Sequence, residues 1–244
     1  MKKENKVGFV IPAYNEEKNI GKVIDSIRKE FIEADIIVTN DVSTDNTLKI
    51  IKEKGVICLT PPFNMRYAMA VQTGIKYAYE NNYDYVIQFD ADGQHLAKEA
   101  KKMYEYIIKN DCDIVIGSRF LKKTDYHHPL FRKIGTFLFQ KTIKILCHKN
   151  ITDPTSGLQC FNKKVIKKYA AIGQYPEYPD ANLIIEMLYE GYKIEEIPVI
   201  MKESNTGKSM HSGIIKPIKY MVRIFYTITI LFIRNIFRRG ADHE

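Results

Sequence analysis

The sequence predicts an α/β fold with a mostly parallel central sheet flanked by helices. Short runs rich in valine and isoleucine alternate with longer segments in which apolar residues recur at helical spacing. This alternation is typical of parallel strands joined by helices that cover both faces of the sheet. The chain has 244 residues, of which 45% are hydrophobic and 27% charged, so it can bury a substantial core in one globular domain.

The first half of the chain carries the clearest alternation. Residues 7–11 form a short β-branched run that favours a buried strand, and residues 16–31 repeat isoleucine and valine at helical spacing. Ser43 or Thr44 is placed to cap the helix that carries residues 48–51. The same criteria predict further strands at residues 35–39, 56–59, 85–89 and 114–116, and further helices at residues 67–79 and 97–109.

The second half of the chain is less regular. Its apolar spacing predicts helices at residues 130–146, 165–171 and 183–189. Residues 153–157, Asp-Pro-Thr-Ser-Gly, have the composition of a loop. A last strand is predicted at residues 194–201, where Pro198 interrupts the run because proline cannot donate to a strand ladder.

Four of the predicted strands run directly into polar residues. These polar groups are residues 14–16, 40–41, 90–92 and 118–119. The carboxyl ends of parallel strands meet at one edge of an α/β sheet, and ligands bind just beyond that edge. We therefore expect all four groups to contribute to a single site.

Asp90 and Asp92 stand one residue apart, directly after the predicted strand at residues 85–89. Two carboxylates this close repel each other unless a cation lies between them. At the end of a strand, a turn can bring both onto one ion, and their hard oxygens suit Mg²⁺ or Mn²⁺, which also bind phosphate. A solvated turn is the alternative, because Asp-Gly is ordinary turn chemistry.

The net charge and the spacing of the cysteines limit which ligands and which cellular compartment the protein suits. The net charge of +8, from 37 Lys and Arg against 29 Asp and Glu, suits phosphate-bearing ligands or an anionic membrane surface. No nucleic-acid recognition motif is present, and the basic residues are not interleaved with an aromatic platform, so we expect no nucleic-acid partner. The four cysteines form no C-x-x-C pair, which argues against zinc and fits a reducing compartment.

The ordered motifs of the chain resemble those of family 2 glycosyltransferases. The resemblance is strongest to the branch of dolichyl-phosphate mannose synthases and bacterial cell-surface glycan transferases. It spans about residues 6–213 and is carried by IPAYNEE (11–17), NDVSTDNT (40–47), NMRYAMAVQTGIKYA (64–78), DADGQH (90–95), GSRF (117–120), DPTSGLQCFNKK (153–164) and GKSMHSG (207–213). It implies a GT-A fold and a nucleotide-diphospho-sugar donor, with transfer that inverts the anomeric configuration. The implied acceptor is a polyprenyl phosphate or a growing cell-envelope glycan.

The resemblance also implies roles for individual residues around the donor. Asp90 and Asp92, with Ala91 between them, would hold Mg²⁺ or Mn²⁺ on the sugar diphosphate, with Gln94 as a further ligand. Asp41 would reach the base or the ribose. The remaining implied donor and phosphate contacts are Pro12, Ala13, Tyr14, Glu16, Arg119 and Arg132.

The acceptor determines whether a general base is needed. A hydroxyl acceptor needs one, usually a carboxylate, whereas a phosphate acceptor is already anionic. Asp153, in the Asp-Pro-Thr-Ser-Gly loop, is the first candidate for a base or an acceptor contact, and a turn-forming role before Pro154 is its alternative. Asp180 is the second candidate.

Several positions depart from the family pattern. Val42 stands where relatives have the glycine of Asp-Gly-Ser, and because valine disfavours positive φ, we expect this turn to differ or relax. Arg66 replaces a glycine of the loop before the third helix, and Asn182 and Ser204 replace an acid and an arginine. Lys208 can supply part of the lost positive charge.

These departures leave two hypotheses. The protein is an enzyme with an altered donor or acceptor, or it is a catalytically silent member that binds nucleotide or acts as a scaffold. The intact set Asp41, Asp90, Asp92, Gln94 and Arg119 favours the enzyme.

The C-terminal segment, residues 214–244, is predicted to be a basic apolar helix attached to a catalytic domain at residues 1–213. Its uncharged core, residues 224–233, is too short to span a bilayer. The helix can instead lie in a membrane interface, pack on the domain or form a homo-oligomer contact. We expect a cytoplasmic protein that is peripheral on the inner face of the cell membrane.

Overall fold

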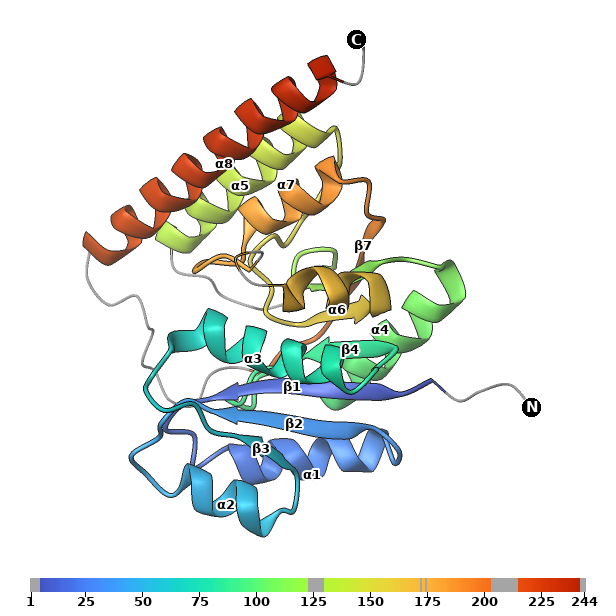
Figure 1. The fold of residues 1–244 in the computed structure, drawn as a ribbon, viewed down its shortest axis with the longest axis vertical. Coiled ribbons are helices and arrows are strands. Elements are labelled where there is room, and N and C mark those ends of the chain that lie inside the picture. The colour runs from blue at the N-terminus through green and yellow to red at the C-terminus, as the bar shows by residue number, and fades with distance from the viewer. Residues whose placement is uncertain (1–4, 123–129, 172, 174, 203–214, 242–244) are drawn as a thin grey trace.

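The computed structural model describes residues 5–122, 130–171, 173, 175–202 and 215–241, although the side chains of residues 130–132, 215–218 and 239–241 are not described. Its centre is a seven-stranded sheet in the order β3-β2-β1-β4-β6-β5-β7 (Figure 1). The strands are β1 Val7–Ala13, β2 Asp35–Asn40, β3 Ile57–Leu59, β4 Tyr85–Gln88, β5 Ile114–Ser118, β6 Gln159–Asn162 and β7 Ile194–Pro198. Only β6 is antiparallel to its neighbours, so the prediction of a mostly parallel sheet is confirmed.

Helices cover both faces of the sheet, as the alternation predicts. The helices are α1 Ile20–Glu30, α2 Thr47–Glu53, α3 Arg66–Glu80, α4 Ala97–Asn110, α5 Leu130–Cys147, α6 Lys163–Ala170, α7 Ala181–Tyr189 and α8 Ile215–Ala241. Successive residues of β1 serve opposite layers: Val10 packs with α3 and α6 to α8, whereas Phe9 and Ile11 pack with α1 and α4. The two hydrophobic cores follow from the two-residue period of the strand.

The short strand β6 is absent from the sequence-based prediction. It has only four residues, lies between β4 and β5, and pairs antiparallel with both, with Gln88 opposite Gln159. Every one of its hydrogen-bonding neighbours is distant in sequence, so no local pattern marks it. By running back between two parallel strands, β6 places residues 153–157 beside the end of β4.

Helices α1 and α2 begin differently from the prediction. Helix α1 begins at Ile20 rather than at residue 16, because the Glu16 carbonyl first closes a turn with the Asn19 amide. Neither Ser43 nor Thr44 caps α2, which begins after Asn46 without a side-chain cap. The two residues instead join the ends of β1 and β2.

The contacts of Asn15 make this join. The Asn15 amide donates to Ser43 Oγ at 3.0 Å, and Asn15 Oδ1 accepts from the Thr44 amide at 2.8 Å. The Ser43 hydroxyl and the Thr44 backbone amide therefore hold the end of β1 against the turn after β2.

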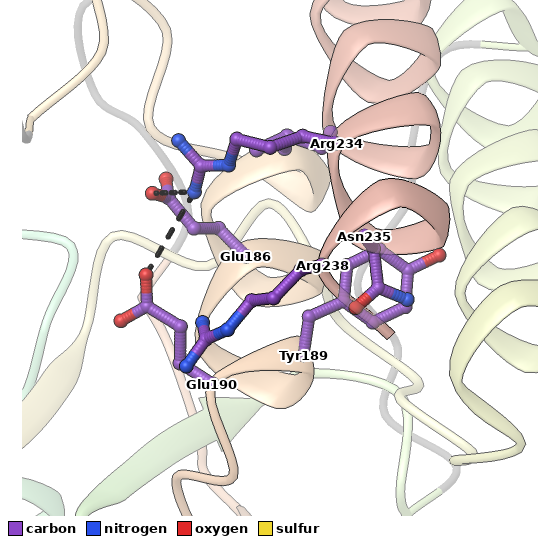
Figure 2. A pocket seen from close by; sticks show the side chains of 7 residues that line it. Glu186, Tyr189, Glu190, Arg234, Asn235 and Arg238 are labelled. Atoms are coloured by element: carbon purple, nitrogen blue, oxygen red, sulfur yellow. Dashed lines mark hydrogen bonds and ion pairs between the residues drawn. The ribbon is translucent and has the colours of Figure 1, made fainter. Parts of the chain in front are cut away.

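Helix α8 packs against α7 and α5 in the layer farthest from β3 (Figure 1). Ile224 and Ile228 are buried in the core, and Arg234 lies 3.2 Å from Glu186 and 3.8 Å from Glu190 on α7 (Figure 2). Among the described residues, the stretch Lys219–Arg238 of α8 is also long and apolar enough to cross a membrane. Of that stretch, 17% is buried inside the structure, on the face that packs against α7 and α5.

Three non-glycine residues near the carboxyl ends of β1 and β2 adopt positive φ. They are Asn15 at 57°, Val42 at 60° and Arg66 at 68°. Asparagine tolerates this region, but a β-branched residue there is a strong outlier. The expectation that the turn at Val42 would differ or relax is therefore wrong. The chain retains the glycine-like turn and accepts the strain.

Replacing Val42 by glycine should raise the free energy of unfolding by about 1–2 kcal/mol, because the left-handed conformation carries no penalty in glycine. Urea denaturation of the full chain measures the change. Val56→Gly is the matched control, because Val56 lacks positive φ and packs against the core, and this variant should lose stability. Equal losses in both variants would contradict the interpretation of strain at Val42.

Candidate functional site

The polar ends of the strands converge on one edge of the sheet, as predicted. Glu16, which follows β1, is close enough to Asp90 and Asp92 for their charges to raise its pKa, although burial is the larger cause. The charge of Arg119, which follows β5, contributes to lowering the pKa of Asp90. Arg119 also acts on Asp180, which precedes α7. We refer to this edge as the rim.

Asp41 anchors the start of α3. Its carboxylate oxygens accept the backbone amides of Met65 at 2.7 Å and Arg66 at 2.8 Å, and its backbone carbonyl accepts from Asn64 at 2.9 Å. A carboxylate is favourable at a helix N-terminus, where free amides and the helix dipole meet it. Asp41 is buried, and its bond to the Arg66 amide fixes the backbone at this residue. Contact of Asp41 with a nucleotide stays a prediction.

The motif after β1 offers one exposed aromatic face. Pro12 and Ala13 are buried within β1, so their side chains serve the core. Tyr14 is 51% exposed, and its ring is available to a flat ligand. Glu16 accepts from the Asn19 side chain at 2.9 Å. Of the four predicted donor contacts in this motif, Tyr14 and Glu16 present side chains at the rim.

Asp90 is held from three sides. Its Oδ1 accepts from the Tyr67 hydroxyl at 2.8 Å, and its Oδ2 accepts from His95 Nε2 at 3.0 Å. Gly157 lies so close that a Cβ on it would come within 2.6 Å of Asp90 Oδ2. Burial alone would raise the pKa of Asp90, but the hydrogen bonds from His95 and Tyr67 outweigh it and lower the pKa.

The buried negative charge of Asp92 is less well compensated by hydrogen-bond donors than that of Asp90. It accepts from the Gln94 amide at 2.9 Å and from Gln94 Nε2 at 2.5 Å. Burial, followed by the charge of Asp90, raises the pKa of Asp92. Gln94 thus donates to Asp92 from both its backbone nitrogen and its side-chain nitrogen. If Gln94 is a metal ligand, as predicted, its side-chain oxygen would bind the ion.

The donor set fits a hard divalent cation. Asp92 and Glu16 both have pKa values raised by burial and by neighbouring acids, and a cation among them would relieve that repulsion. Among the residues that the structure describes, no three His, Cys, Asp or Glu side chains gather to enclose an ion by themselves. Mg²⁺ commonly binds one or two protein carboxylates and completes its shell with phosphate and water, so a full protein cage is not required for such an ion.

Arg119 and Asp153 form a buried ion pair. The guanidinium donates from Nε to Asp153 Oδ2 at 2.6 Å and from an Nη atom to Oδ1 at 2.7 Å. Asp153 is fully buried, and its backbone amide donates to Glu196 at 2.8 Å. This geometry argues against Asp153 as a general base, because no acceptor hydroxyl can reach a carboxylate that is enclosed and bound to a guanidinium.

Asp180 lies at the start of α7 and accepts from the Tyr220 hydroxyl of α8 at 2.5 Å. Burial raises its pKa to about 6, against the lowering effects of Tyr220 and Arg119. A pKa in this range is compatible with a general base that acts near neutral pH. The Asp180 carboxylate is bound by Tyr220 and that of Asp153 by Arg119, so the role of each as a base stays a prediction.

Some residues of the site are not singled out from the sequence, and the side chains of two predicted ones lie outside the part of the chain that the structure describes. Tyr67 and Gly157 contact Asp90; they lie inside the motifs at residues 64–78 and 153–164, but no local pattern shows that they meet Asp90. His95 lies inside the DADGQH motif, which is the one signal that could have singled it out. The predicted contacts of Arg132 and Lys208 fall on side chains outside the described residues.

Three comparisons bear on the identity of the chain. The family model described as "Glycosyl transferase family 2" matches residues 9–170. An uncharacterised protein of Methanocaldococcus jannaschii is 33% identical, over 86% of each chain. The UDP-N-acetylglucosamine–dolichyl-phosphate N-acetylglucosaminyltransferase of Methanococcus voltae is 31% identical, over 91% of this chain and 94% of the relative.

Among solved structures, glucosyl-3-phosphoglycerate synthase of Mycobacterium tuberculosis, in complex with Mn²⁺, uridine-diphosphate-glucose and phosphoglyceric acid, superposes with a TM-score of 0.67. The match covers 93% of this chain and 80% of the synthase at 16% identity. At that identity the likeness concerns the fold. It confirms the predicted GT-A architecture.

The raised pKa of Asp180 predicts a pH dependence of stability. Between pH 4 and pH 6 the folded state binds more protons than the unfolded state, so this group makes the protein less stable as the pH rises through that window. Asp180→Asn removes the effect and should be more stable than the wild type by about 1–2 kcal/mol at pH 7.

Urea denaturation at pH 4, 5, 6 and 7 tests this prediction. The stability difference between Asp180→Asn and wild type should grow as the pH rises. Asp25→Asn, which alters an exposed ion pair with Lys54 on the other face of the sheet, serves as the control and should lack this trend. A difference that is constant with pH would refute the assignment to Asp180.

Proposed function

This chain belongs to glycosyl transferase family 2, and on that basis we propose that it is an inverting, metal-dependent enzyme that transfers a sugar from a nucleotide-diphospho-sugar to a polyprenyl phosphate. The observation that carries the proposal is the crowding of Asp90, Asp92 and Glu16 at the rim, where burial and mutual repulsion raise the pKa values of Asp92 and Glu16. A dicationic metal bound to a diphosphate would supply the charge that this arrangement lacks.

The donor nucleotide would lie across the ends of β1 and β2. Tyr14 offers its half-exposed ring to the base, and the backbone of Pro12 and Ala13 borders the same position. Asp41 supports this region by fixing the start of α3 through its two bonds to backbone amides, and contact with the ribose or the base is proposed for it from the sequence resemblance. The proposed pocket therefore combines one aromatic surface with a fixed backbone edge.

The diphosphate would lie beyond β4. Asp92 is the principal proposed ligand of Mg²⁺ or Mn²⁺, with Asp90 and the Gln94 amide oxygen completing the protein's share. Bound there, the ion stabilises the negative charge that develops on the leaving nucleoside diphosphate. Tyr67 and His95 keep the Asp90 carboxylate oriented, as outer-shell partners commonly do around metal ligands.

The relative from Methanococcus voltae, which is named for a dolichyl-phosphate acceptor, supports the proposal of a phosphate acceptor. A polyprenyl phosphate attacks as an anion, so neither Asp153 nor Asp180 has to remove a proton. In that reaction, Arg119 and Asp153 act together as a rigid support for the rim. Arg132 and Lys208 remain proposed phosphate contacts on the basis of the sequence resemblance.

A growing cell-envelope glycan is the second candidate acceptor. One observation favours it: the pKa of Asp180, at about 6, is close to the value that suits a general base at neutral pH. In this alternative, Asp180 would accept the proton of the attacking hydroxyl. Tyr220 of α8, which donates to Asp180, would then hold the base in place.

The acceptor side is proposed to meet a membrane through α5 and α8. Along α8, large apolar side chains are exposed at helical spacing on the face away from the domain: Val222, Tyr226, Ile230, Ile233 and Phe237. On α5 the exposed apolar side chains are Ile134, Phe137, Leu138 and Ile145. Two adjacent helices with such stripes, beside basic residues, suit an anionic bilayer interface.

We propose a catalytic unit at residues 1–213 and a membrane-contacting helix at residues 214–244, on the inner face of the cell membrane. The helix would lie in the interface and not cross the bilayer, because Arg223 and Arg234 pair with Glu177 and Glu186 of the domain. Withdrawing either arginine into hydrocarbon would break its ion pair and bury its charge.

Asp92→Asn should lower kcat/KM by on the order of 10²–10³, because it removes the proposed principal metal ligand. The assay measures release of nucleoside diphosphate from a panel of sugar nucleotides with Mn²⁺ and a polyprenyl phosphate. Asp84→Asn, at the opposite end of the same strand, is the matched control and should retain activity. Nucleotide binding without turnover in the wild type would support the catalytically silent alternative instead.

Ile233→Asp combined with Phe237→Asp should reduce binding to vesicles of phosphatidylglycerol and phosphatidylcholine at least tenfold, because both side chains belong to the exposed apolar face of α8. Co-sedimentation with the vesicles measures the change. Ile32→Asp alters an equally apolar residue that is 91% exposed after α1, and its binding should match the wild type. Vesicle binding that survives the double substitution, or a dimer that the substitution dissociates, would contradict the membrane assignment.

A further inference from the structure

A row of hydrogen bonds runs through the interior from the segment before α7 to Asp90. The Tyr175 hydroxyl donates to Gln88 Oε1 at 3.3 Å, and Gln88 Nε2 donates to the Tyr67 hydroxyl at 3.1 Å. The Tyr67 hydroxyl donates in turn to Asp90 Oδ1 at 2.8 Å. Gln88 and Tyr175 are buried, so water does not compete with these bonds. All three donors point toward the carboxylate.

Aligned donors of this kind strengthen one another in a low-dielectric interior. Each bond in the row polarises the next, and the last one fixes Asp90 Oδ1. His95 fixes the other oxygen, and Gly157 leaves no space behind the carboxylate. Rotation of Asp90 would therefore break two hydrogen bonds and leave buried polar groups without partners, which is costly.

The far end of the row belongs to a segment that is attached to α8. Within residues 175–180, Glu177 pairs with Arg223 of α8 at 2.7 Å and with Arg66 at the start of α3 at 3.2 Å. Asp180 accepts from Tyr220 of α8. The same short segment thus contacts the C-terminal helix on one side and, through Tyr175, the buried row on the other.

We propose that Tyr67 and Tyr175 are positioning residues for Asp90, acting through Gln88, and that they make the orientation of this carboxylate depend on the segment docked against α8. The proposal rests on the proposed function, in which Asp90 contributes to metal-diphosphate binding. Tyr67 acts directly on the carboxylate, whereas Tyr175 acts on Tyr67 by orienting the Gln88 side chain. Neither tyrosine has to touch the metal.

The test uses calorimetry on the full chain with MnCl₂ and whichever of UDP and GDP the wild type binds more tightly. Tyr67→Phe should weaken nucleotide binding in the presence of Mn²⁺ by about tenfold, within the range for outer-shell partners of metal ligands. Tyr175→Phe should weaken it by about threefold, because its effect passes through Gln88. Binding in EDTA should be unchanged in both variants, a result that general damage to the pocket would not give.

The double variant tests whether the two tyrosines act in one row. Once Tyr67 has lost its hydroxyl, Tyr175 has no route to Asp90, so the double variant should bind no more weakly than Tyr67→Phe alone. Tyr83→Phe is the matched control, because the Tyr83 hydroxyl donates to Asp35 at 2.7 Å at the opposite end of the sheet. It should lose stability and keep Mn²⁺-dependent binding.

Three results would overturn the inference: wild-type binding by Tyr67→Phe, equal weakening with and without Mn²⁺, or additive losses in the double variant. If Tyr67→Phe does not fold, unchanged Mn²⁺-dependent binding by Tyr175→Phe overturns it. Each of these leaves the proposed function intact as long as the wild type needs the metal. A wild type whose nucleotide binding ignores Mn²⁺ overturns both the proposed function and this inference.

Discussion

Compensation of buried negative charge is the constraint on which the rim depends. A carboxylate withdrawn from water is tolerated only when donors or a cation replace the lost hydration. Asp41 meets this requirement with two backbone amides of the α3 start, Asp90 with Tyr67 and His95, and Asp153 with a guanidinium. Each solution joins segments that are distant in sequence, so the same bonds that neutralise the charges also fix the strand ends relative to one another.

The acids with incomplete compensation are the ones available to a ligand. Asp92, Glu16 and Asp180 all have raised pKa values, and burial is the largest cause in each. Perturbed acids of this kind mark functional sites when they gather at the carboxyl edge of an α/β sheet. The carboxylates of the rim thus fall into two groups that the sequence does not distinguish. One group is neutralised by donors of the fold, and the other still lacks a positive partner.

The sequence predicts most of the fold because its signals are local. Alternating apolar runs and helical spacing locate the parallel strands, the helices around them and the convergence of their polar ends. The same reasoning misses β6, whose four residues gain their identity from β4 and β5. It also presents Asp153 as a candidate base, because a local motif cannot reveal that Arg119, 34 residues earlier, encloses it. Val42 shows the opposite limit: the conformational preference of valine disfavours a positive φ, yet Val42 adopts one in the turn after β2.

The pair of Arg119 and Asp153 closes the excursion of the chain that contains α5. Because the Arg119 amide and its guanidinium both bind Asp153, the chain leaves the sheet and returns to it at a single fastened point. Within that excursion, Phe139 and Ile143 of α5 are buried in the core against α7 and α8. The fastened point therefore joins two demands on the segment: its ends stay at the sheet, and its helix has to keep its apolar face packed on the domain.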